Sequence, residues 1–100
     1  MIKHIVMWTF AEHAEGADKA TNLETARARL SDLNGLVPGM HAFEPVIPQH
    51  GFESTYDLVL YSEFDTPEDL KAYATHPAHV AVAEFIGKVR TSRACMDYEV

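Results

Sequence analysis

The chain is predicted to fold as an α+β protein, with a four-stranded antiparallel sheet and two helical regions in the ferredoxin-like order βαββαβ. The hydrophobic pattern changes along the 100 residues in the order strand, helix, strand, strand, helix, strand. With 47% hydrophobic residues, a single domain spanning residues 1–100 can bury one core. Two of the strands carry large apolar residues on both faces, so both faces of the sheet are expected to be covered.

The first strand is expected over residues 2–10, where large apolar side chains alternate onto both faces. The polar segment 12–16 ends it. An amphipathic helix follows, because apolar residues recur at three- and four-residue intervals. These are Ala20, Leu23, Ala26, Leu30 and Leu33. Asn34 and Gly35 end this helix, since glycine suits the left-handed position after a helix C-terminus.

The second strand, residues 40–47, is the least regular one. Pro45 and Pro48 cannot donate hydrogen bonds to a ladder, so this strand belongs at a sheet edge or at a bulge. After a mainly polar loop at residues 49–55, the alternation over residues 56–64 predicts the clearest strand in the chain.

The second helical region is interrupted by a proline. Thr66 can cap its start, and Pro67 suits the first helical position. Pro77 has no N–H and disfavours helical geometry at His76, so one helix is expected to stop near Thr75 and another to start at Pro77. The polar side chains at this junction can turn towards a cavity.

A last strand, residues 92–100, completes the sheet. If both helices cover one face, the other face presents apolar side chains to solvent. These include Ile5, Met7, Val59 and Tyr61. An exposed apolar face of that size is a liability in a monomer. A two-fold partner that covers it is the expected solution, which makes the protein a homodimer.

Composition excludes several classes of protein. The net charge of −7 and the absence of a basic stripe argue against binding to nucleic acid. No apolar run approaches membrane-spanning length and no signal peptide is evident, so no membrane association is expected. The single cysteine, Cys95, cannot form an intramolecular disulfide and is expected to be a small buried hydrophobe in a cytoplasmic protein.

Four short segments can be taken together. They are Lys3-His4-Ile5-Val6, Tyr56-Asp57-Leu58-Val59-Leu60, His76-Pro77-Ala78-His79-Val80 and Asp97-Tyr98. In this order and spacing the chain resembles the stress-responsive A/B barrel (Dabb) family over nearly its whole length. The resemblance implies one Dabb domain whose ferredoxin-like subunits dimerise through their sheets into an α+β barrel. Most members of the family have no assigned reaction.

The resemblance also implies site residues. A similar plant protein is a polyketide cyclase, of the olivetolic acid cyclase type, which closes an aromatic ring by aldol condensation. By this likeness, His79 corresponds to the base of that enzyme, Tyr73 to its tyrosine and His4 to its strand histidine. The pocket wall is then expected to include three apolar residues from the first and third strands. They are Val6, Trp8 and Leu58.

The residues themselves allow two interpretations. A histidine can act as a general base because its pKa of about 6.5 lies near neutral pH. His79 and Tyr73 could then converge on one acidic C–H and one ligand oxygen, as enolate or aldol chemistry requires. Alternatively, His79 hydrogen-bonds backbone freed by Pro77, and Tyr73 fills space with its hydroxyl reaching water. His4 taken alone is a hydrogen-bonded core histidine, and His76 a junction residue.

Two function classes follow from these interpretations. The first is a homodimer that binds a small apolar or polyketide-like molecule in a pocket between helices and sheet. The second is a cofactor-independent cyclase, lyase or isomerase with His79 as base. No metal is expected, because Pro77 keeps His76 and His79 from sharing one regular helical face and no cysteine lies near them in sequence. No haem motif supports a haem-dependent or oxygen-using relative.

Overall fold

The computed structural model describes residues 1–100 and confirms the ferredoxin-like α+β fold. Along the chain lie β1 (Ile2–Phe10), β2 (His13–Ala14), β3 (Ala17–Asp18), α1 (Lys19–Ser31), β4 (Met40–Val46), β5 (Leu58–Phe64), α2 (Pro67–Thr75), α3 (Pro77–Val89) and β6 (Arg90–Glu99). The main sheet has the order β4-β5-β1-β6, and all its neighbours are antiparallel. The first and last strands therefore pair, although they are the most distant in sequence.

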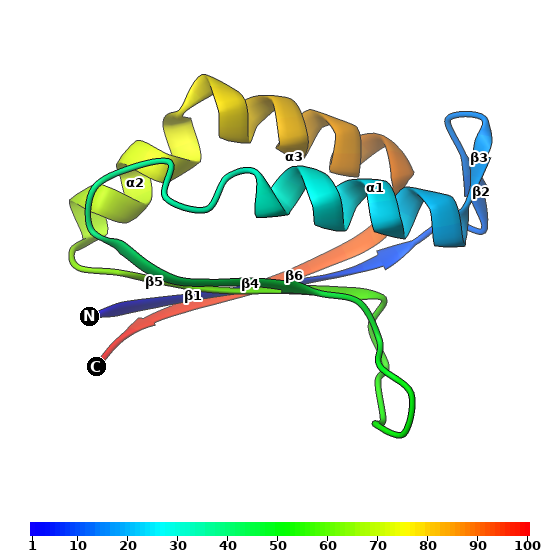
Figure 1. The fold of residues 1–100 in the computed structure, drawn as a ribbon, viewed down its shortest axis with the longest axis horizontal. Coiled ribbons are helices and arrows are strands. Elements are labelled where there is room, and N and C mark those ends of the chain that lie inside the picture. Colours follow the sequence, from blue (N-terminus) through cyan, green and yellow to red (C-terminus); the bar gives the residue numbers. More distant parts are fainter.

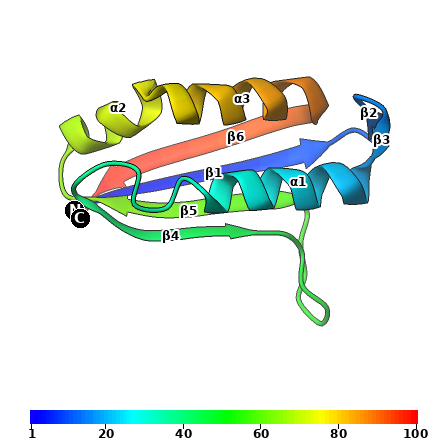
Figure 2. The ribbon, with the colours of Figure 1, turned by 45° about the horizontal axis from the view of Figure 1, so that its top comes forward.

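The helices lie on one face of this sheet, as Figures 1 and 2 show. Along β1 and β5 the side chains on that face are buried, while those on the opposite face are only partly buried. The core therefore forms between the helices and the sheet, and it includes Phe10, Leu30, Phe64 and Ile86. No helix is both long enough and apolar enough to cross a membrane.

The first helix begins and ends slightly earlier than its hydrophobic pattern indicates. The Asp18 side chain caps it by accepting a hydrogen bond of 2.8 Å from the Thr21 backbone N–H. The helix ends at Ser31, so Leu33 lies in the following turn, where it is still buried. Gly35 has the expected left-handed conformation, with a φ of 79°, but it does not cap the helix, whose C-cap is Asp32 in the right-handed conformation.

The break at Pro77 is confirmed. The Thr66 hydroxyl accepts a hydrogen bond of 3.1 Å from the Asp69 N–H and starts α2, which ends at Thr75. His76 is extended, with a φ of −64° and a ψ of 135°, and its Nδ1 accepts a bond from the Ala78 N–H to cap α3. His76 is thus a structural residue of the junction, in agreement with its sequence interpretation.

Three features differ from the pattern-based expectations. Residues 12–16 do not simply end β1: β2 and β3 form a small hairpin around Glu15 and Gly16, which have φ values of 52° and 77°. Such a turn needs two residues in the left-handed conformation, and in the sequence only Gly16 indicated one. The third expected strand starts at Leu58, and the last one starts at Arg90, directly after α3. The edge position of the proline-containing β4 is confirmed.

The sheet face opposite to the helices carries several exposed apolar side chains. On β6, Met96 is 67% exposed and Tyr98 is 40% exposed. The segment between β4 and β5 extends away from the sheet on the side opposite to the helices, as Figure 1 shows, and its Phe52 is 76% exposed. This face is the part of the surface that most resembles an uncovered contact area.

Candidate functional site

A cavity of about 220 Å³ lies between the helices and the sheet. Its wall includes residues from β1, β5, β6 and all three helices. They are His4, Val6, Trp8, Leu30, Leu60, Tyr73, Ala74, His79, Val82, Ala83, Ile86, Arg90 and Arg93. The three candidate residues His4, Tyr73 and His79 therefore meet in one cavity, although they come from three separate elements.

Tyr73 is completely buried, and its hydroxyl has no hydrogen-bond partner. Its ring packs against Phe64 and Phe43, with centroid distances of 5.3 and 6.0 Å. The sequence interpretation in which this hydroxyl reaches water is therefore wrong. Burial raises the pKa of Tyr73 far above its ordinary value, so the hydroxyl keeps its proton and can donate it in a hydrogen bond.

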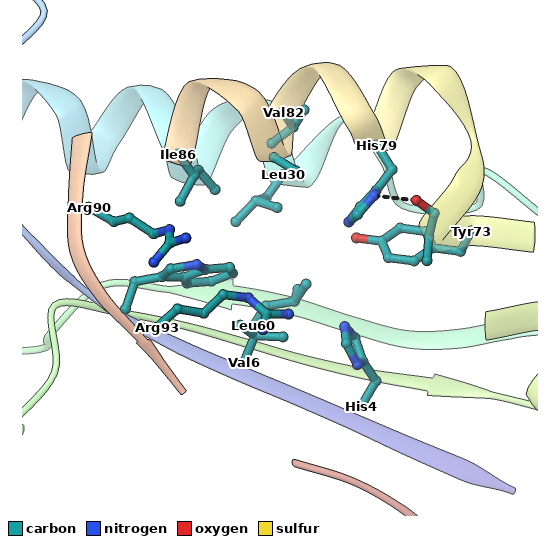
Figure 3. A pocket seen from close by; sticks show the side chains of 13 residues that line it. His4, Val6, Leu30, Leu60, Tyr73, His79, Val82, Ile86, Arg90 and Arg93 are labelled. Atoms are coloured by element: carbon teal, nitrogen blue, oxygen red, sulfur yellow. Dashed lines mark hydrogen bonds between the residues drawn. The ribbon is translucent and has the colours of Figure 1, made fainter. Parts of the chain in front are cut away.

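His79 stands over Tyr73, with ring centroids 4.6 Å apart (Figure 3). Its Nδ1 lies 2.9 Å from the carbonyl oxygen of Ala74. Because a carbonyl can only accept, Nδ1 carries the proton, and the Nε2 of the neutral ring has a free lone pair. Burial lowers the pKa of His79 and outweighs the hydrogen bond to the Ala74 carbonyl, which raises it; His4 and Arg93 nearby lower it further. These effects together favour the neutral form of the ring, which a base requires.

The contact with Ala74 also explains the helix junction. The Ala78 N–H would ordinarily bond to the Ala74 carbonyl, but it bonds to the side chain of His76. The Nδ1–H of His79 satisfies that carbonyl instead. Backbone capping by His79 was one of the two sequence interpretations, and it occurs. It uses only one ring nitrogen, so it is compatible with a role for the other.

His4 points from β1 towards the helices and is 9% exposed. Its Nδ1 lies 2.5 Å from Oδ1 of Asp97, the residue that pairs with it on β6. A carboxylate accepts the Nδ1 proton, which fixes the ring and leaves Nε2 without a protein partner. The His4 and Tyr73 ring centroids lie 6.4 Å apart. His4 is thus a hydrogen-bonded histidine, as expected, and it also lines the cavity.

Two of the three expected wall residues line the cavity, namely Val6 and Trp8. Leu58 does not: it pairs with Trp8, is 1% exposed within the core, and contributes to a separate hollow beside the segment between β4 and β5. Leu60, two residues further along the same strand face, occupies the position expected for Leu58. The sequence located this strand correctly, but which of its residues line the cavity depends on its register with β1.

Three polar residues of the site were not predicted. Asp97 belongs to a segment that carried the family resemblance, and the pairing of first and last strands in this fold could have located it beside His4. Arg90 and Arg93 line the cavity although they are three residues apart in an extended strand. Regular alternation puts such residues on opposite faces, so no sequence pattern indicated that they share one.

Cys95 is exposed, so the expectation of a buried cysteine is wrong. It shares the helix-facing side of β6 with Asp97, and β6 is an edge strand on which every residue except Ala94 is exposed. The donor atoms of His4, Cys95 and Asp97 lie within 4.8 Å of one another, and these are the residues that could hold a metal ion. Hydrogen bonds join both His4 and Cys95 to Asp97, and a metal would have to replace them.

The site can thus bind and polarise an oxygen-containing molecule. Tyr73 supplies a buried hydrogen-bond donor, and the Nε2 atom of His79 supplies an acceptor or a base. The wall between them and the arginines is mainly apolar. A ligand that is apolar in the middle and carries an oxygen at the Tyr73 end fits this distribution.

Comparison with protein families and solved structures supports this architecture. Residues 2–100 match the family model described as Stress responsive A/B Barrel Domain, or Dabb. A dimeric protein of unknown function and ferredoxin-like fold from Bacteroides fragilis is 31% identical, with a TM-score of 0.82 and coverage of 99% of this chain and 95% of that one. The comparison with curated proteins gives no match.

Two further structures are similar in fold. A Dabb family protein from Mesorhizobium loti is 22% identical, with a TM-score of 0.74 and coverage of 99% and 95% of the two chains. A hydroxynitrile lyase from Passiflora edulis has a TM-score of 0.77 at 13% identity, with coverage of 99% and 92%. At these identities the likeness concerns the fold and assigns no reaction.

Proposed function

Because the chain belongs to the stress-responsive A/B barrel family, we propose that it is a homodimer that binds a small, mainly apolar molecule in the cavity beneath its helices. The observation that carries this proposal is the completely buried Tyr73 hydroxyl without a partner. Leaving such a group unpaired costs about 1–3 kcal/mol. A ligand oxygen that accepts from Tyr73 removes that cost, so the cavity is built to favour an occupant.

The cavity volume limits the size of this molecule. A cavity of about 150 Å³ holds benzene, and the cavity here is about 220 Å³. The ligand is therefore about one six-membered ring with a few substituents. An extended polyketide chain would need additional space.

Binding of acetophenone, a one-ring ketone, tests this proposal. The Tyr73→Phe variant should bind it about 3- to 10-fold more weakly, which corresponds to one lost hydrogen bond. Tyr61→Phe is the matched control, because its hydroxyl bonds Lys3 and Glu63 on the other face of the sheet. Affinities can be measured by ligand-observed NMR. Equal binding by the wild type and Tyr73→Phe would contradict the proposed role of the hydroxyl.

A second candidate function is catalysis, which the free Nε2 of His79 favours. In this step Nε2 takes the proton from a carbon next to the ligand carbonyl. The C–H electron pair moves into an enolate, whose oxygen accepts a hydrogen bond from Tyr73. The Asp97 carboxylate orients His4 at the same end of the cavity, where its Nε2 can accept a hydrogen bond from the ligand.

Exchange of the methyl protons of acetophenone in D₂O, followed by NMR, tests this step without knowledge of the natural substrate. The wild type should accelerate the exchange. His79→Gln should not, although glutamine can still donate a hydrogen bond to the Ala74 carbonyl. If both proteins bind acetophenone but neither accelerates exchange, the protein binds its ligand without this chemistry.

The homodimer is proposed to form through the sheet face opposite to the helices. That face carries the exposed Met96 and Tyr98, and the segment between β4 and β5, which includes the exposed Phe52, extends on the same side. The similar protein from Bacteroides fragilis is described as dimeric. Two sheets packed in this way would enclose an α+β barrel with its helices outside.

Sedimentation analysis of the mass in solution tests the dimer. The wild type should sediment as a dimer at micromolar concentration, and Met96→Asp should sediment as a monomer because it places a charge in the contact. Val80→Asp, on the exposed side of α3, is the control and should remain dimeric. A wild-type monomer would refute this part of the proposal and leave the cavity unaffected.

A further inference from the structure

We propose that Arg90 and Arg93 bind a carboxylate of the ligand, so that the molecule taken up by the cavity is a small carboxylic acid. The carboxylate of this acid lies at the end of the cavity where β6 begins, next to Arg90 and Arg93. Its other oxygen accepts a hydrogen bond from Tyr73. This inference rests on the proposed binding function and specifies the chemical class of the ligand. Guanidinium groups suit such a role because their planar donors match the two oxygens of a carboxylate.

A β-bulge places both arginines on the cavity face. Along β6, Arg93 pairs with Trp8 and Ser92 with Thr9, but the next pair joins Arg90 to Phe10, so Thr91 is the extra residue. The Thr9 hydroxyl makes hydrogen bonds to the side chains of both Thr91 and Ser92. The side chains of Thr91 and Ser92 therefore both lie on the sheet face opposite to the helices, and Arg90 and Arg93, which flank them, both face the cavity.

Neither arginine has a carboxylate partner. Lys3, Lys19 and Arg27 all form ion pairs with acidic side chains, and Arg29 lies over the ring of Phe85. Arg90 and Arg93 form no ion pair, although the chain has 15 acidic residues. Two exposed guanidinium groups thus remain available at the rim of an otherwise mainly apolar cavity.

The two ends of the cavity are well separated. Arg93 pairs with Trp8 and Asp97 pairs with His4, so the two ends differ by four residues along the β1–β6 ladder. At about 3.3 Å per residue this separation is about 13 Å along the strands. Figure 3 shows Arg90 at one end and His79, Tyr73 and His4 at the other, with the Arg93 side chain extending from the Arg90 end towards the middle of the cavity, beside Val6. A para-substituted ring carries its two polar groups at opposite ends, so one group can reach the arginines while the other reaches Tyr73.

The pair para-acetylbenzoate and para-acetylbenzamide tests the inference, because the two probes share a ring and a ketone and differ in charge. The wild type should bind the acid about tenfold more tightly than the amide. The net charge of −7 repels anions in general, so such a preference has to come from a local site. In Arg90→Gln/Arg93→Gln the preference should disappear. Lys88→Gln, which removes a nearby charge outside the cavity, should keep it.

The outcomes separate this inference from the proposed function. Equal binding of acid and amide by the wild type, or a preference that survives in the double variant, would overturn the role of the arginines while the cavity remains a binding site. If neither probe shifts the NMR signals of Tyr73 and His79 at millimolar concentration, both proposals fail. Both arginines are exposed, so the double variant should fold, and its melting temperature verifies this.

Discussion

The unpaired hydroxyl of Tyr73 makes a prediction about stability that is opposite to that of most core substitutions. Tyr73→Phe keeps the ring, which fills the space beside Phe43 and Phe64, and removes only the oxygen. In the unfolded chain that oxygen is hydrated, whereas in the folded chain it has no hydrogen-bond partner in the protein. Its burial costs about 1–3 kcal/mol. The variant is therefore expected to be more stable than the wild type by about 1 kcal/mol, the lower end of this range.

Urea unfolding at pH 7, followed by circular dichroism, measures this difference. A gain of about 1 kcal/mol raises the melting temperature of a 100-residue domain by about 4–8 °C. Tyr61→Phe is again the control: it loses hydrogen bonds to Lys3 and Glu63, so it should lose about 0.5–1.5 kcal/mol. All variants are compared at one protein concentration, because dimerisation contributes to apparent stability.

One result would refute this reasoning. If Tyr73→Phe is less stable than the wild type by 1 kcal/mol or more, the hydroxyl is satisfied in solution, and the cavity is not poised for a ligand oxygen. A gain in stability together with weaker acetophenone binding would show that the residue serves binding at the expense of stability.

Three further predictions concern other parts of the chain. The pKa of His79 is lowered in the folded state, so as the pH falls below about 6.5 the unfolded chain binds a proton first and the free energy of unfolding decreases. His79→Gln should reduce this decrease between pH 7.5 and 5.5, as measured by urea unfolding. Thr66→Ala removes the cap on the Asp69 N–H and should cost about 1 kcal/mol, whereas no loss in urea unfolding would mean that water replaces the cap. Burial and the Asp97 carboxylate raise the pKa of the Cys95 thiol, so iodoacetamide should alkylate it slowly at pH 7. Asp97→Asn should speed this alkylation, and an unchanged rate would contradict the electrostatic effect of Asp97.

Much of the fold could be predicted because its signals are local. Alternating apolar residues identified the strands, and the helical spacing from Ala20 to Leu30 identified α1. Thr66 and Pro77 set the start of α2 and the break before α3, because a cap and a missing N–H act within a few residues. The inward direction of His4 followed from strand alternation. The strands β2 and β3 were not predicted, because a strand of two residues is too short to show an alternation of apolar and polar residues.

The sequence by itself thus determined the elements, their order and the residue types that the helix junction supplies. Only the tertiary structure decided which of them meet. Asp97 reaches His4 through pairing between the two ends of the chain, and the bulge at Thr91 turns Arg90 and Arg93 to one face. The isolation of the Tyr73 hydroxyl likewise depends on what every surrounding element leaves unfilled. Element type depends on neighbours in sequence, whereas register and cavities depend on packing between distant segments.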